Sequence, residues 1–128
     1  MNSIEVARFV RAEPSSVALV LAGPAARELW PRRSDRAVAV IGGEATTVTV
    51  DPPRRAGVGF VARIVVTEAD AVVGTGRLTI RPAHGDEGGC DLAMSLSGVD
   101  DHGRRLRRDV ARYLDNVARV SRERSSAA

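Results

Sequence analysis

The sequence predicts an α+β fold in which a curved antiparallel sheet is covered by one long C-terminal helix. Short runs rich in valine, isoleucine and threonine fill residues 37–97, and the links between them are at most eight residues long. Links of this length leave no room for crossover helices, so neighbouring strands must run antiparallel. The last 28 residues instead carry apolar side chains at helical spacing. A chain of 128 residues has the length of one domain, and we expect a single domain over residues 1–128.

The N-terminal part of the chain predicts a strand followed by two short helices. Residues 4–11 are mostly apolar and include isoleucine, valine and phenylalanine, which favour a strand. Pro14 suits the first turn of a helix, and the residue on either side of it is placed to cap nearby N–H groups. We expect this helix over residues 17–22. A Gly-Pro pair then ends it and starts a second helix over residues 25–30.

Five further strands are predicted in the middle of the chain, which gives six in total. Turn signals separate them, such as the Gly-Gly pair at 42–43 and the polar, glycine-containing segment at 83–89. The Gly-x-Gly triplets at 57–59 and 74–76 lack the third glycine of a dinucleotide fingerprint, and we expect them to let strands bend. The strands are expected at residues 37–41, 46–50, 58–67, 72–81 and 90–97.

Apolar and polar residues alternate along these strands, which predicts that one face of the sheet is buried. Leu78 and Ile80, for example, alternate with arginine and threonine. A sheet with one apolar face and one mixed face is covered on one side only. The side chains expected on the covered face are Val48, Val50, Phe60, Ala62, Ile64, Val66, Leu78, Ile80, Cys90, Leu92, Met94 and Leu96.

The cover is predicted to be a helix that starts at Asp100 or Asp101 and runs to about Glu123. About 24 residues at 1.5 Å per residue span roughly 36 Å, which is enough to cross a sheet. We expect this helix to be the only lid of the sheet, and the last four residues to be frayed. Its apolar stripe consists of Leu106, Val110, Tyr113, Leu114, Val117 and Val120.

Three segments carry a resemblance to a known family. Residues 6–21, continuing to Leu29-Trp30-Pro31, look like an opening strand followed by two short helices that end in tryptophan. Residues 76–82 and 90–96 look like the family's last two strands. With the long final helix, this order resembles the helix-grip fold of the START-like, or Bet v 1-like, superfamily, whose small bacterial members are labelled SRPBCC or polyketide cyclase/dehydrase proteins. The chain departs from the family in having six predicted strands where seven are usual.

The resemblance implies a cavity between the sheet and the C-terminal helix that holds an apolar ligand, such as a lipid, a polyketide, a sterol-like or an aromatic compound. The inward-facing positions agree in part, since they are rich in small side chains that leave space unfilled. The alternative is that the same side chains meet and pack solidly. The candidate ligand-binding residues are Phe60, Ala62, Leu78, Ile80, Leu92, Met94, Val110, Tyr113, Leu114 and Val117.

Two other function classes remain open beside a binding protein. A polyketide cyclase or dehydratase needs an acid/base pair in the cavity, and the sequence offers Tyr113 with Asp91 or Arg63. A protein-interaction module would use the arginine-rich helix face or the open edge of the sheet. Tyr113 is the best candidate for a polar contact to a ligand, because it is the one hydroxyl on the apolar stripe.

Other side chains with reactive groups are expected to be structural. His84 and His102 lie in turn-like contexts without a nucleophile or an orienting partner, so we expect both on the surface. Asp86 and Glu87 follow His84 in a glycine-containing turn, where solvated charges are commoner than metal ligands. Cys90 lies on the apolar face and is expected to be a buried, inert thiol. We expect no cofactor and no bound metal.

The charge pattern predicts that the protein does not bind nucleic acid. The net charge is +3, and all 19 basic residues are arginine. Four of them, at 104, 105, 107 and 108, lie together at the start of the C-terminal helix. The chain has four aromatic residues, too few for a base-stacking surface. Acids at i,i+4 spacing should also partly neutralise the helix, in the pairs Asp101–Arg105, Arg105–Asp109, Asp115–Arg119 and Arg119–Glu123.

The sequence also predicts a cytoplasmic protein. The first five residues lack the basic-then-apolar order of a signal peptide. No apolar run approaches the roughly 20 residues that a membrane span needs. A single cysteine excludes an internal disulfide framework.

Overall fold

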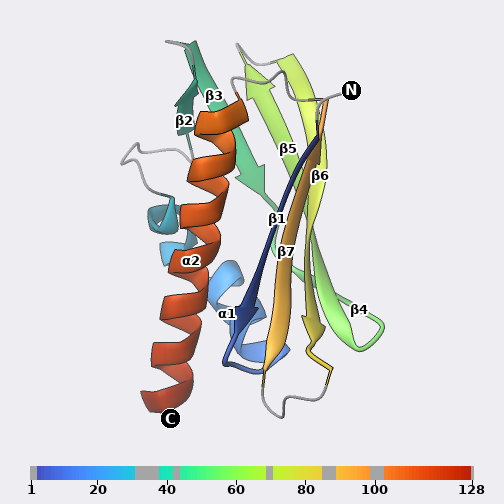
Figure 1. Cartoon of the computed structure of the whole chain (residues 1–128), viewed down its shortest axis with the longest axis vertical. Coiled ribbons are helices and arrows are strands. Elements are labelled where there is room, and N and C mark those ends of the chain that lie inside the picture. The colour runs from blue at the N-terminus through green and yellow to red at the C-terminus, as the bar shows by residue number, and fades with distance from the viewer. Residues whose placement is uncertain are drawn as a thin grey trace.

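The computed structural model describes residues 3–30, 38–41, 44–68, 71–84, 89–98 and 103–127. It confirms the α+β class, with a long C-terminal helix on an antiparallel sheet (Figure 1). The elements in chain order are β1 (Ser3–Val10), α1 (Pro14–Ala22), the 3₁₀ helix η1 (Pro24–Leu29), β2 (Val38–Ile41), β3 (Glu44–Val50), β4 (Arg54–Ala56), β5 (Gly59–Glu68), β6 (Ala71–Pro82), β7 (Cys90–Ser97) and α2 (Gly103–Ala127).

The sheet has the order β1-β7-β6-β5-β3-β2, and every pair of neighbours is antiparallel. The seventh strand, β4, pairs with β5 beyond the end of β3. The prediction of six strands was therefore one short. Strand β4 escaped it because it has only three residues, all exposed, and so carries no alternation of apolar and polar side chains.

The predicted alternation along the strands is confirmed. On β7, Cys90, Leu92, Met94 and Leu96 are buried, while Asp91 and Ser97 are exposed. The strand register joins such residues into rows across the inner face, since a residue and its cross-strand partner point to the same side. One row consists of Val6, Met94, Leu78 and Ala62, from four successive strands.

The expectation that α2 is the only lid was wrong. Helix α2 makes most of its strand contacts with β1 and a few with β2 and β7, and β1 and β2 are the two edges of the sheet (Figure 1). Helix α1 contacts α2 on one side and the central strands β5 and β6 on the other. The sheet curls around α2, so α2 meets the edges of the sheet. The shorter helix α1 covers part of the middle of the sheet. Local periodicity gave no sign of this, because α1 is too short to show a clear stripe.

The helix ends differ in detail from the prediction. Pro14 stands in the first turn of α1, and Glu13 is the N-cap, but its side chain forms no capping hydrogen bond. The Glu13 carbonyl instead accepts from the N–H of Ser16 at 3.0 Å. The second short helix is the 3₁₀ helix η1, and α2 continues to Ala127. The Gly-Gly turn and both candidate caps of α2, Asp100 and Asp101, lie outside the described residues.

Glycines allow β6 to approach both of its neighbours closely. A Cβ atom at Gly59 would overlap the carbonyl oxygen of Ile80, and one at Gly76 would overlap that of Ser95. Gly57 has a φ of 59°, a conformation that side chains disfavour. These glycines therefore allow close strand pairing, whereas the predicted role of the Gly-x-Gly triplets was to let strands bend.

Candidate functional site

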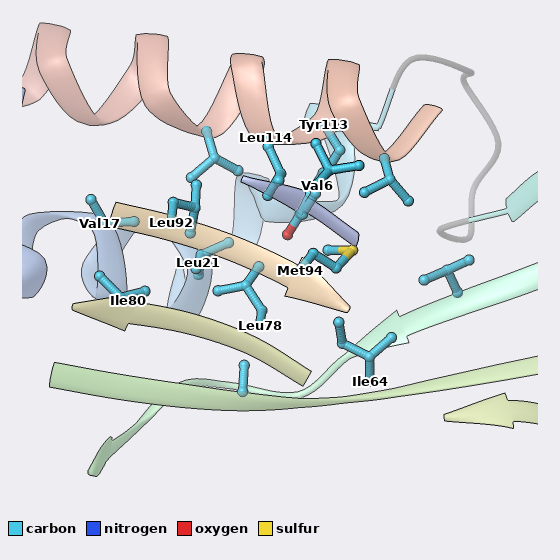
Figure 2. Close-up of a cluster of buried hydrophobic side chains, with 14 of the residues drawn as sticks. Val6, Val17, Leu21, Ile64, Leu78, Ile80, Leu92, Met94, Tyr113 and Leu114 are labelled. Atoms are coloured by element: carbon cyan, nitrogen blue, oxygen red, sulfur yellow. The ribbon is translucent and has the colours of Figure 1, made fainter. Parts of the chain in front are cut away.

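The structure brings the ten predicted pocket residues into one hydrophobic cluster between the sheet and the helices (Figure 2). Nine of them are almost completely shielded from solvent, and Phe60 is half-buried at the margin. The guanidinium carbon of Arg55, on the neighbouring strand β4, lies 5.6 Å from the centroid of the Phe60 ring. Phe60 therefore lies at the rim of the cluster, and the other nine form its interior.

Helix α1 contributes residues to this cluster that the sequence did not place there. Val17 and Leu21 point from α1 into the space between the sheet and α2, near Leu92 and Ile80 (Figure 2). They close the cluster at the end of the sheet where α1 lies. Their place in the cluster follows from the contacts of α1 with β5, β6 and α2. These three elements are distant from α1 in sequence, so the sequence alone did not indicate it.

Tyr113 is held in place by an aromatic contact. Its ring stacks on the indole of Trp30, with centroids 4.0 Å apart and planes inclined by 11°. Trp30 directly follows η1, and a hydrogen bond of 2.7 Å from Asn116 Nδ2 to the Leu29 carbonyl joins the same two elements. Trp30 thus holds the ring of the candidate ligand contact in place.

The Tyr113 hydroxyl points from α2 toward the sheet, among the side chains of Met94, Leu78 and Leu21 (Figure 2). Burial raises the pKa of this phenol well above its ordinary value. The hydroxyl is therefore neutral at physiological pH and available as a hydrogen-bond donor.

Two polar residues of α2 are buried without having been predicted. Ser121 is completely shielded, and its hydroxyl has no hydrogen-bond partner among the residues described. Asp109 is 8% exposed. Both lie next to the apolar stripe of α2 at helical spacing. The sequence therefore predicted the direction of the buried face of α2 correctly but made this face too narrow.

The proposed acid/base partners of Tyr113 lie on the opposite face of the sheet. Arg63 and Asp91 alternate with buried neighbours on β5 and β7, and both are exposed. Tyr113 contacts the inner face instead. The structure therefore does not bring either residue to the candidate site.

Cys90 and His84 have the environments that the sequence predicted. Cys90 is fully buried, and burial, with a smaller effect of the Asp91 charge, raises the pKa of its thiol from 9.0 to about 11. A thiol of this kind is protonated at neutral pH and is a poor nucleophile. His84 is exposed. His102, Asp86 and Glu87 lie outside the described residues, which contain no cluster of three metal-binding side chains.

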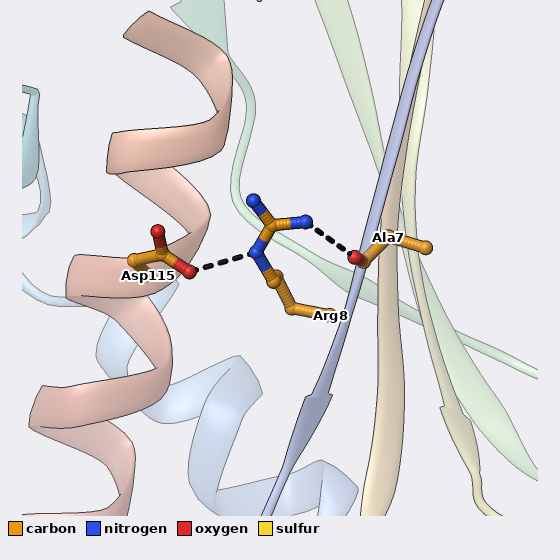
Figure 3. Close-up of polar contacts among 3 residues, drawn as sticks. All are labelled: Ala7, Arg8 and Asp115. Carbon is orange, nitrogen blue, oxygen red and sulfur yellow. Dashed lines mark hydrogen bonds and ion pairs between the residues drawn. The ribbon is translucent and has the colours of Figure 1, made fainter. Parts of the chain in front are cut away.

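Asp115 has a different partner from the one predicted. Its carboxylate accepts a hydrogen bond of 2.8 Å from Nε of Arg8, on β1, rather than pairing with Arg119 (Figure 3). A second nitrogen of Arg8 donates to the Ala7 carbonyl at 2.8 Å, which orients the guanidinium toward the helix. Of the other predicted pairs, Arg119–Glu123 is present at 3.9 Å, and the two that involve Arg105 lie outside the described side chains.

Two hollows are lined by described residues, and both lie on the surface. One, of about 280 Å³, lies between the end of β1 and the C-terminal half of α2. The other, of about 290 Å³, lies over β1, β6 and β7 and is lined in part by Ser3, Thr75 and Ser95. Neither contains any of the ten predicted pocket residues.

Among the described helices, none is both long and apolar enough to cross a bilayer.

Comparison with known proteins supports the fold. No family model and no curated protein matches the sequence. A solved structure from Chromobacterium violaceum has 18% identity and a TM-score of 0.66, with 95% of this chain and 99% of that chain covered. A hypothetical protein of Helicobacter pylori has 11% identity and a TM-score of 0.63, with 94% and 88% covered. The KanY protein has 15% identity and a TM-score of 0.59, with 94% and 97% covered.

At these identities, the likeness concerns the fold alone. The similar structures span almost the whole chain, so the arrangement of sheet and C-terminal helix is shared over its full length. This arrangement is compatible with a helix-grip-like fold.

Proposed function

We propose that this chain is a START-like small-molecule binding protein that holds an apolar ligand between the central strands and α2. The curvature of the sheet supports this proposal, because α2 contacts mainly β1, with fewer contacts to β2 and β7, while the inner face of the central strands β5 and β6 lies farther from it. The space between α2 and the central strands is therefore spanned by side chains, not by a close approach of the two backbones. A ligand of lipid, polyketide or aromatic type would lie against Ala62, Leu78 and Met94, which share one cross-strand row.

The observation that carries the proposal is the Tyr113 hydroxyl. Tyr113 is almost completely shielded from solvent, and burial keeps its hydroxyl protonated, so it can donate a hydrogen bond to a ligand. A carbonyl or ether oxygen on an apolar ligand would accept this hydrogen bond, which is worth about 0.5–1.5 kcal/mol net. The preferred ligand is therefore an apolar molecule with one hydrogen-bond acceptor, oriented with that acceptor toward the middle of α2.

Binding is favoured over catalysis because the two acid/base partners considered for Tyr113, Arg63 and Asp91, lie on the outer face of the sheet. Asp109 is buried one helical turn before Tyr113 on α2, and Cys90, within the cluster, is protonated. A cyclase or dehydratase reaction requires a proton donor and a proton acceptor near the reacting atoms. A protein-interaction module without a ligand is the remaining alternative, and the experiment below separates it from a binding protein.

The proposal is tested with a fluorescent apolar probe, N-phenyl-1-naphthylamine, which brightens when it enters an apolar site. We expect saturable binding to the wild type. We expect Ala62→Phe to abolish it, because the added ring fills the inner face. Ala93→Phe is the matched control, since Ala93 lies on the outer face of the same sheet, and we expect it to leave binding unchanged.

Two results would count against the proposal. Unsaturable fluorescence with the wild type indicates a packed core and favours an interaction module. Equal loss of binding in Ala62→Phe and Ala93→Phe indicates that the probe binds the surface or a destabilised chain. Should Ala62→Phe fail to fold, Tyr113→Phe removes one oxygen without adding volume and tests the same site.

A further inference from the structure

The groove between β1 and α2 has a lining rich in arginine. Its walls come from the end of β1 and from one side of the C-terminal half of α2. Three of its seven lining residues are arginines, and one is an acid. The lining consists of Phe9, Val10, Arg11, Asp115, Ala118, Arg119 and Arg122.

The one carboxylate of this lining is already engaged. Asp115 accepts from Arg8, which is not itself part of the lining (Figure 3). The contact of Arg119 with Glu123, at 3.9 Å, involves two side chains that are each more than half exposed. Such an exposed contact contributes little. Arg11 and Arg122 have no acidic partner among the residues that the structure describes.

The charges around the groove therefore do not balance. Four arginines, at 8, 11, 119 and 122, face two acids, at 115 and 123, which leaves two positive charges in excess. The sequence had predicted a more neutral face, with Asp115 paired to Arg119 within the helix.

The same side of α2 continues the positive charge toward its N-terminus. Arg108 and Arg112 are exposed and precede Asp115 by seven and three residues, so they lie in line with Arg119 and Arg122. Arginine is suited to oxyanions because its planar fork donates two parallel hydrogen bonds.

We propose that this groove binds the phosphate group of a phosphomonoester. A phosphomonoester carries about 1.5 to 2 negative charges at neutral pH, which matches the excess positive charge better than a carboxylate does. Arg11 and Arg122 donate to its oxygens from opposite walls, and Arg119 exchanges its weak contact with Glu123 for the ligand. The half-buried Ala118 lies beside the carbon portion of the ester. This site is separate from the apolar cluster, so each can fail without the other.

The test is a calorimetric titration with phenyl phosphate, inorganic phosphate and benzoate at matched ionic strength. We expect both phosphates to bind more tightly than benzoate. We expect Arg11→Gln and Arg122→Gln each to weaken phenyl phosphate binding by about fivefold, as for loss of an exposed charged contact. Arg54→Gln is the matched control, since Arg54 is exposed on β4, away from α2, and the substitution changes the net charge equally (Figure 1).

Vesicles of phosphatidylcholine with and without phosphatidic acid distinguish a soluble ester from a lipid headgroup. Binding of phenyl phosphate that is weakened at Arg11 and Arg122 but not at Arg54 supports a soluble ligand. The same pattern with phosphatidic acid vesicles alone supports the groove as a headgroup site. Absence of binding to both, equal affinity for benzoate, or an equal loss in Arg54→Gln overturns the proposal.

Discussion

The indole ring of Trp30 lies face to face with the phenol ring of Tyr113, with centroids 4.0 Å apart. This stack joins the end of η1 to the middle of α2 and aims the Tyr113 hydroxyl at the sheet (Figure 2). The hydrogen bond from Asn116 to the Leu29 carbonyl supports the same junction. The geometry of the candidate ligand contact thus depends on residues more than 80 positions away in the sequence.

Replacement of Trp30 should destabilise the whole domain. Trp30 is buried and contacts the core cluster, so we expect Trp30→Ala to lower the free energy of unfolding by about 3–5 kcal/mol. Leu19→Ala is the control, because Leu19 is 69% exposed on α1 and should cost less than about 0.5 kcal/mol. Urea denaturation followed by circular dichroism measures both. Similar costs for the two variants would show that the stack is dispensable.

Loss of the ion pair between Arg8 and Asp115 should have a small effect on stability. Both side chains are partly exposed, at 38% and 58%, so we expect a coupling of about 0.2–1 kcal/mol. A double-mutant cycle with Arg8→Gln and Asp115→Asn measures it, and added salt should reduce it. A coupling of zero at low salt would contradict the contact.

The Cys90 thiol should make the protein less stable at alkaline pH. Its pKa is about 11 in the folded state against 9.0 ordinarily, so the unfolded chain releases the proton first as the pH rises. The free energy of unfolding should therefore be unaffected by this group below pH 9 and should fall between pH 9 and 11. Urea unfolding at about pH 8 and about pH 10.5 should show a larger loss for wild type than for Cys90→Ala. A parallel loss in both proteins would refute the assignment to Cys90.

Addition of a methyl group at Gly76 should disturb the pairing of β6 with β7. A Cβ atom there would overlap the Ser95 carbonyl oxygen, so the strands must separate. We expect Gly76→Ala to cost about 1–3 kcal/mol, the usual range for overpacking. Gly57→Ala, where no atom lies within 4 Å of a Cβ, should cost only about 1 kcal/mol through its positive φ. The reverse order of thermal midpoints would contradict this account of the strand pairing.

Much of the fold was predictable because its elements carry periodic signals. Strand β7 has four buried residues at alternate positions, and its predicted bounds of 90–97 agree with the structure. The apolar stripe of α2 predicted its buried face, from Leu106 to Val117. These patterns depend on each element alone, so a single sequence contains them.

The remaining features depend on contacts between distant segments. Asp115 has an arginine four residues away, but it pairs with Arg8, which is 107 residues away. The position of α1 between α2 and the central strands likewise depends on how the chain turns after β1. The outer-face position of Arg63 and Asp91, in contrast, follows from alternation with buried neighbours along each strand.

The most direct test of the central claim is the affinity of a matched ligand pair for wild type and Tyr113→Phe. The pair is 2-acetonaphthone and 2-ethylnaphthalene, which have similar size and differ in one carbonyl oxygen. Each is measured by displacement of N-phenyl-1-naphthylamine. We expect wild type to prefer the ketone by about fivefold to tenfold, as for one net hydrogen bond, and Tyr113→Phe to show no preference. A preference for the ketone that persists in Tyr113→Phe, or failure of both compounds to displace the probe from wild type, would contradict a ligand site at Tyr113.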